Sequence, residues 1–189
     1  MSLVTSVLTY EDLCRQRDDG NRYELIDGEL VMMAGPSPKH QFASLELAFV
    51  FRRAVFERGL GFVFHAPLDV RLPPANYVQP DVLVVLRARA HIIGPALIDG
   101  APDIVAEITS ASSATLDRTR KLALYARAGV REYWLVELQA RRVVVYADAE
   151  EDRYRRVDAF AGDDTARSTV VPGLEVTTSA LFSGLPTDE

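Results

Sequence analysis

The segment Pro102–Ser110 reads PDIVAEITS. Residues 104–108 within it form a nearly continuous apolar run, which predicts a strand that is covered on both faces. We expect a helix over residues 115–128, ended by Gly129, and then a second apolar strand over residues 132–136. A strand, a helix and a strand joined by short connections predict a parallel crossover. Such alternation is typical of an α/β domain.

The flanking segments predict the rest of a mixed sheet. Asp27-Gly28 separates two strand-like segments, residues 22–26 and 29–33, and is a strong hairpin signal. The remaining expected elements are a short helix from Thr9 to about Arg17, a helix from Ser37 and Pro38 to about Gly59, strands over residues 62–64, 68–72, 82–86, 143–146, 154–157, 169–171 and 174–176, and a final helical turn. Helices on both faces of a mixed, twisted sheet are therefore expected.

The helix that is predicted after Ser37 contains large apolar side chains at helical spacing. They are Phe42, Leu45, Phe49 and Phe56. His40 and Gln41 stand at its start together with Lys39, where backbone amides and the helix dipole favour phosphate. A DNA contact and a capped, solvated helix start are both open interpretations there.

Composition limits the class of protein. A chain of 189 residues with 48% hydrophobic and 25% charged residues suits one globular domain, which we expect to span residues 1–189. The single Cys14 cannot form an internal disulfide, so a cytoplasmic location is expected. No apolar run approaches the ~20 residues of a membrane span. A net charge of -6 argues against indiscriminate nucleic-acid binding.

Several common catalytic motifs are absent from the sequence. It contains no Gly-rich phosphate loop after a strand, no Gly-x-Ser-x-Gly motif and no paired Cys or His at metal-ligand spacing. Kinases, dinucleotide-dependent enzymes, elbow-type hydrolases and zinc peptidases are therefore disfavoured.

Two acidic residues stand at apolar strands. Glu107 lies inside the 104–108 run, where a carboxylate needs a cation, a hydrogen-bond donor or a proton. Asp81 follows Pro80 at the start of the 82–86 run. If these strands are neighbours, the two carboxylates can converge on one divalent metal, and oxygen ligands suit magnesium. The alternatives are that Asp81 caps a turn and that Glu107 pairs with a buried arginine.

Lysine is rare in this chain, which has 19 arginines and only two lysines. Lys121 lies in the helix that follows the Glu107 strand, so the crossover returns it toward the same sheet. An ammonium there can polarise an attacking water or stabilise charge on a phosphate. The alternative is a surface ion pair between Lys121 and Asp117, four residues earlier on the helix.

A family resemblance rests on several motifs in order. They are RYELIDGEL (22–30), PDVLV (80–84), PDIVAEITS (102–110), DRTRK (117–121), YARAGV (125–130) and EYWLV (132–136). From about Tyr10 to Phe182 the chain resembles the bacterial Uma-type restriction endonucleases of the PD-(D/E)XK nuclease superfamily.

The resemblance implies a restriction-endonuclease-like core in which Asp81 and Glu107 bind a metal. Glu24 matches an acid that approaches the metal through water, and the alternative for it is a solvent-facing hairpin residue. The superfamily carries a lysine two residues after the glutamate, where this chain has Thr109. The resemblance implies that Lys121 takes its place.

The sequence therefore predicts an endonuclease that requires Mg²⁺, with Mn²⁺ as a substitute, and that hydrolyses phosphodiester bonds of DNA. The main-chain carbonyl of Ile108 is a further candidate metal ligand. RNA stays open as a substrate. Arg118, Arg120 and Arg127 are candidate contacts to the phosphate backbone, or else a solvated helix face. The alternative function is an inactive nuclease-fold module for nucleic-acid or protein binding and assembly, in which C-terminal edge strands support a homodimer.

Overall fold

The computed structural model describes residues 8–17, 19–110 and 112–186. The expected domain over residues 1–189 also includes residues 1–7, 18, 111 and 187–189, which lie outside the described residues. The helices and strands are, in chain order, α1 (Tyr10–Arg17), β1 (Arg22–Ile26), β2 (Glu29–Met33), α2 (Pro38–Val55), β3 (Gly61–His65), β4 (Val70–Leu72), β5 (Asn76–Val78), β6 (Val82–Leu86), a 3₁₀ helix (Arg87–Ile92), β7 (Ile98–Asp99), β8 (Ile104–Thr109), α3 (Ala114–Leu116), a π-helical turn (Asp117–Lys121), α4 (Leu122–Ala128), β9 (Glu132–Glu137), β10 (Arg142–Glu150), β11 (Arg153–Ala161), β12 (Thr165–Arg167), β13 (Glu175–Thr177) and α5 (Thr178–Ser183).

The main sheet has six strands in the order β11-β10-β9-β8-β6-β3. β8 and β9 run parallel, as the predicted crossover requires, and the other neighbouring strands are antiparallel. The sheet is therefore mixed, as expected. Within the described part of the chain, no helix is long and apolar enough to cross a membrane.

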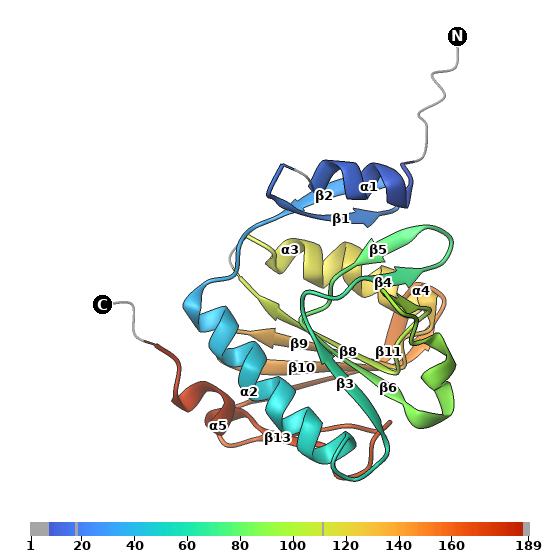
Figure 1. Cartoon of the computed structure of the whole chain (residues 1–189). Helices are drawn as coiled ribbons and strands as arrows, with labels where there is room; N and C mark the ends of the chain where they lie inside the picture. The colour runs from blue at the N-terminus through green and yellow to red at the C-terminus, as the bar shows by residue number, and fades with distance from the viewer. Residues whose placement is uncertain (1–7, 18, 111, 187–189) are drawn as a thin grey trace.

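The helix α2 covers one face of the main sheet, with α5 and the β12–β13 pair beside it (Figure 1). Its buried apolar residues are spaced four apart, and they are Ala43, Leu47, Phe51 and Val55. Leu45, Phe49 and Phe56 are instead exposed. Two sets of apolar residues at helical spacing therefore run along α2, and the set that begins at Ala43 packs against the sheet.

The guanidinium groups of two arginines cover part of the exposed set of apolar residues on α2. Arg52 lies 5.0 Å from the ring centre of Phe56, and Arg53 lies 6.0 Å from that of Phe49. These cation–π contacts let aromatic rings remain at the surface.

The other face of the main sheet carries the helix formed by α3, the π turn and α4, together with a second sheet. This small sheet has the order β2-β1-β5-β4-β7. In Figure 1 the α3–α4 helix lies between the β1–β2 hairpin and the main sheet. The hairpin was predicted, and Asp27 and Gly28 turn it with positive φ angles of 54° and 79°. Helices on both faces of the main sheet confirm the predicted fold class.

The predicted strand over residues 169–171 is wrong, because this segment bonds to a side chain rather than to a strand. The buried carboxylate of Glu132 accepts hydrogen bonds from Ser168 Oγ at 2.7 Å, from the amide and hydroxyl of Thr169 at 2.5 and 2.6 Å, and from Val170 N at 3.1 Å. Glu132 thereby joins the loop after β12 to the start of β9.

We expect Glu132→Ala to lower the free energy of unfolding by more than about 3 kcal/mol, because several buried donors lose their acceptor. Urea unfolding, followed by the fluorescence of the buried Trp134, measures the change. Glu175→Ala, which removes an exposed partner of Arg167, is the control and should change the stability by less than about 1 kcal/mol. A Glu132→Ala variant with the wild-type urea midpoint would contradict this account of the loop.

Candidate active site

The pairing of β6 with β8 brings Asp81 and Glu107 together. The two strands are antiparallel neighbours with Val82 opposite Ala106. The same register, extended by one residue, places Asp81 opposite Glu107. Side chains alternate between the faces of a strand, so both carboxylates share the face of Leu83, which packs toward α4. The predicted adjacency of the two strands is therefore confirmed.

The carboxylate of Asp81 is held from two sides. Its Oδ2 accepts a hydrogen bond from Ile108 N at 2.8 Å and lies 3.1 Å from His40 Nε2, at the start of α2. A residue's N–H and C=O point to the same edge of a strand, so the carbonyl of Ile108 also faces the Asp81 side of β8. The expected ligand positions Asp81, Glu107 and Ile108 thus lie next to one another.

Glu107 is 4% exposed and has two donors at one oxygen. Its Oε1 accepts hydrogen bonds from Lys121 Nζ at 3.0 Å and from Tyr125 Oη at 2.5 Å. Burial raises the pKa of Glu107 well above its usual value, and the charges of Asp81, Asp117 and Glu24 raise it further, whereas Lys121 opposes the shift. An anionic Glu107 therefore needs more positive charge than Lys121 alone supplies.

Lys121 is 1% exposed and lies among three carboxylates. Its Nζ is 3.0 Å from Glu107 Oε1, 2.9 Å from Glu24 Oε2 and 3.9 Å from Asp117 Oδ1. The alternative interpretation of Asp117 and Lys121 as a surface pair is therefore wrong. Burial alone would lower the pKa of Lys121, but the three carboxylates outweigh it and raise the pKa above its ordinary value. The raised pKa favours the ammonium form of Lys121.

A π-helical turn over Asp117–Lys121 interrupts the helix that carries the lysine. The predicted helix over residues 115–128 is observed from Ala114 to Ala128, and Gly129 ends it with a φ of 86°. A π turn inserts one extra residue and is often found at functional sites. Here it contains both Asp117 and Lys121, which are buried beneath β1.

Glu24, on β1, belongs to the same cluster and is 2% exposed. Its Oε1 accepts hydrogen bonds from Gln79 N at 2.9 Å and from Lys121 Nζ at 3.1 Å. The alternative of a solvent-facing hairpin residue is therefore wrong for Glu24. The solvent-facing residue of the hairpin is instead Glu29, which is exposed and pairs with Arg120.

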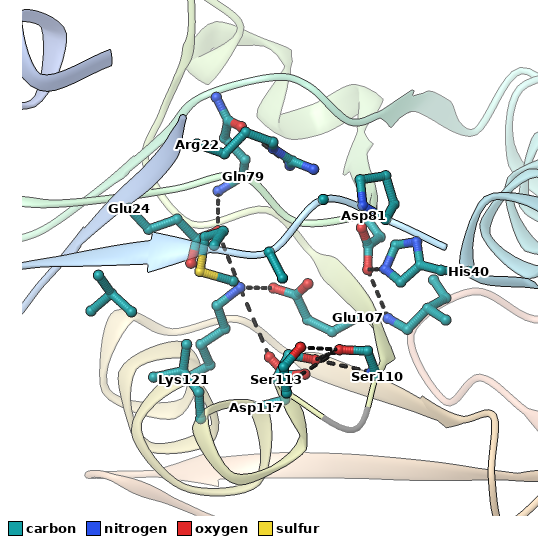
Figure 2. Close-up of a pocket in the computed structure, with 18 of the residues that line it drawn as sticks. Arg22, Glu24, His40, Gln79, Asp81, Glu107, Ser110, Ser113, Asp117 and Lys121 are labelled. Atoms are coloured by element: carbon teal, nitrogen blue, oxygen red, sulfur yellow. Dashed lines mark hydrogen bonds and ion pairs between the residues drawn. The ribbon is translucent and has the colours of Figure 1, made fainter. Parts of the chain in front are cut away.

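These side chains line a pocket of about 400 Å³ between the two sheets. In Figure 2, Asp81, Glu107 and Lys121 point into one space, with His40 beside Asp81 and Asp117 below Lys121. The pocket's four carboxylates outnumber the cations, and its charged or titratable lining residues are Glu24, Asp81, Glu107, Asp117, Lys121, Arg22 and His40.

Comparison with known proteins places the chain in a family. Residues 7–179 match the family model Uma2, described as "Putative restriction endonuclease". The chain belongs to the Uma2 family.

Similar proteins include two uncharacterised proteins of Synechocystis sp. PCC 6803. The chain is 27% identical to sll1609 over 148 residues, which are 76% of this chain and 82% of that protein. It is 25% identical to slr1290 over 173 residues, or 90% and 87% of the two chains. A solved structure from Anabaena variabilis, described as a "putative nuclease belonging to DUF820", superposes with a TM-score of 0.78 at 20% identity and covers 95% of this chain and 99% of that one. The restriction-endonuclease-like fold and the Uma2 resemblance are thereby confirmed.

Several neighbours of this Uma2 site were not predicted as part of it. His40 binds Asp81, Tyr125 binds Glu107 and Gln79 binds Glu24. Gln79 directly precedes the Pro80-Asp81 pair in the sequence, and this position is the signal that could have indicated its contact with the site. The sequence marks His40 only by its place at the start of the predicted helix, and nothing in it indicates the contact with Asp81.

The arginines of the α3–α4 helix have acidic partners within the protein. Arg118 pairs with Glu137, Arg120 with Glu29, and Arg127 with Asp27. This arrangement favours a solvated, ion-paired helix face over dedicated contacts to phosphate.

Asp81 and Glu107 are the two carboxylates of the pocket that could hold a metal ion together. Among the described residues, no group of three or more His, Cys, Asp or Glu side chains is arranged to hold a metal ion. Magnesium commonly uses one or two carboxylates and completes its shell with water and substrate phosphate. The two carboxylates of Asp81 and Glu107 meet that requirement.

The pKa of Asp117 generates a prediction about stability. Burial raises the pKa of Asp117 to about 6, whereas Lys121 opposes the shift. The folded state therefore binds this proton more tightly than the unfolded state does. The stability that Asp117 contributes is complete below about pH 4 and is lost as the pH rises through about 6.

We expect Asp117→Asn, which resembles the protonated form, to increase the free energy of unfolding at pH 8 by up to about 3 kcal/mol in protein without added metal. The gain should vanish near pH 4. Urea unfolding at a series of pH values measures it, with the exposed Asp152→Asn as a control that should follow the wild type. A gain that is equal at pH 4 and pH 8 would contradict the assigned pKa.

Proposed function

We propose that this protein is a metal-dependent endonuclease that hydrolyses phosphodiester bonds of DNA. The observation that carries the proposal is the convergence of Asp81, Glu107 and the buried Lys121 in one pocket of a Uma2 family chain. Asp81 directly precedes β6, Glu107 lies in β8 and Lys121 ends the π turn, and together they span 40 residues of the sequence from Asp81 to Lys121.

The residues present fit a magnesium ion. Asp81, Glu107 and the carbonyl of Ile108 would hold it, because they offer adjacent oxygen atoms on one edge of β8. The excess of carboxylates and the raised pKa of Glu107 support the fit, since a divalent cation would compensate both. Bound there, the metal would polarise the phosphate and lower the pKa of a bound water.

Lys121 supplies a fixed positive charge beside Glu107. Its ammonium lies 3.0 Å from Glu107, although the superfamily position two residues after the glutamate is Thr109. Its raised pKa excludes a role as general base at neutral pH. We therefore assign Lys121 to orienting the attacking water and stabilising the charge that develops on the phosphate.

Glu24 acts through Lys121 in this proposal. Both of its carboxylate oxygens lie within 3.1 Å of the ammonium. Gln79 N fixes Oε1 at 2.9 Å, so the position of Glu24 is coupled to the segment that leads into Asp81. Glu24 is thus a positioning residue for the lysine.

We expect Asp81→Ala, Glu107→Gln and Lys121→Arg each to reduce DNA cleavage in Mg²⁺ or Mn²⁺ by at least about 100-fold. Lys121→Arg is the sharpest test, because a planar guanidinium cannot replace a compact ammonium among three carboxylates. Plasmid cleavage measures the rates, and an RNA substrate in parallel measures the preference for DNA.

Lys39→Arg makes the same change at the other lysine of the chain and should leave cleavage unchanged. A cooperative urea transition shows that each variant is folded. Folded variants at positions 81, 107 and 121 that all cut at the wild-type rate would overturn the proposed function.

A further inference from the structure

A second cavity of about 400 Å³ adjoins the catalytic pocket. The two cavities share the lining residues Arg22, Pro36, Gln79 and Asp81. Asp81 therefore lies at the boundary between the catalytic pocket, which contains Lys121, and the second cavity. A ligand bound at Asp81 can extend into both.

The walls of the second cavity suit a flat heterocycle. Pro36, Pro67 and Ala66 give it apolar surface, and the ring of His65 lies among them. Donation from His65 Nδ1 to the carbonyl of Ala66 at 2.8 Å, and the 2.9 Å contact of Nε2 with Ser44 Oγ, fix the orientation of this ring. A fixed imidazole is a platform on which a nucleobase can stack.

The rim of the second cavity carries side-chain amides. Asn21 and Gln41 both line it and are both exposed. A carboxamide offers one acceptor and two donors, the pattern that pairs with the edge of a base. The cavity thus combines a stacking wall with polar groups at its mouth, as ligand sites commonly do.

Arg22 lies at the boundary between the cavities with an unsatisfied donor. Among the described residues its buried Nε has no hydrogen-bond partner, and its Nη2 donates to Gln79 Oε1 at 3.3 Å. A buried donor without an acceptor costs about 1–3 kcal/mol, and a ligand that supplies the acceptor removes this cost. A phosphate suits this position, because a guanidinium can donate two parallel hydrogen bonds to its oxygen atoms.

We infer that the second cavity binds one nucleoside of the substrate in an unstacked state, while Arg22, at the boundary of the two cavities, binds the scissile phosphate that is esterified to this nucleoside and lies at Asp81. The inference rests on the proposed function and narrows its substrate class to DNA with an unpaired nucleotide beside the cleaved bond. A paired duplex must first extrude that nucleotide, which costs a few kcal/mol, whereas a bulge does not.

Binding in EDTA separates this inference from catalysis. Fluorescence anisotropy compares a fully paired duplex with the same duplex carrying one unpaired nucleotide. We expect the wild-type protein to bind the bulged DNA at least about tenfold more tightly. Gln41→Ala should weaken binding of the bulged DNA and so reduce that preference to within about twofold.

Arg22→Gln should weaken binding to both DNAs and reduce the slope of log affinity against log salt by about one, which Gln41→Ala should not do. The exposed Gln139→Ala and Arg153→Gln are matched controls that should bind as the wild type does.

Equal affinity of the wild type for the two DNAs would overturn the subsite, and so would Gln41→Ala and Arg22→Gln variants that bind as the wild type does. Cleavage by the same wild-type protein in Mg²⁺ would then still support the proposed function. The expected binding pattern without any cleavage would support the subsite and count against the proposed function.

Discussion

The ammonium of Lys121 joins the small sheet to the main sheet. It bridges Glu24 of β1 and Glu107 of β8, two strands that share no backbone pairing. Removing two charges from water is expensive, and breaking a buried pair leaves an uncompensated charge. The hairpin, the π turn and β8 therefore keep one relative position as long as the ammonium has both partners, and the walls of the pocket depend on that arrangement.

Glu107 and Glu132 show how burial of the same side chain can serve structure or chemistry. Glu132 is surrounded by hydroxyl and amide donors, including Trp134 Nε1 at 3.1 Å, and it closes a loop. Glu107 has an ammonium and a phenol at one oxygen and lies in a pocket with three other carboxylates. A group with neutral donors is complete without a ligand, whereas an excess of negative charge creates a place for a cation.

The sequence predicted the parts of the site that depend on local pattern. Apolar runs located β6 and β8, and the crossover placed Lys121 near Glu107. The ion pair between Glu24 and Lys121 could not be predicted. Burial of Glu24 depends on the pairing of β1 with β5, which lies about 50 residues later in the chain. The π turn also left no periodic signal. In α2, two sets of apolar residues have helical spacing, and the spacing alone does not show which set packs against the sheet.

Anomalous diffraction from crystals soaked in Mn²⁺ tests whether the pocket binds a metal, because it locates a cation without requiring turnover. We expect a single strong peak between the carboxylates of Asp81 and Glu107, on the Ile108 side of β8, with Lys121 Nζ within about 4–6 Å. We also expect the peak to be lost in Glu107→Gln crystals while the position of Lys121 is kept. The absence of a peak in the pocket at saturating Mn²⁺ would contradict this metal site. A peak that lies elsewhere and persists in Glu107→Gln crystals would also contradict it.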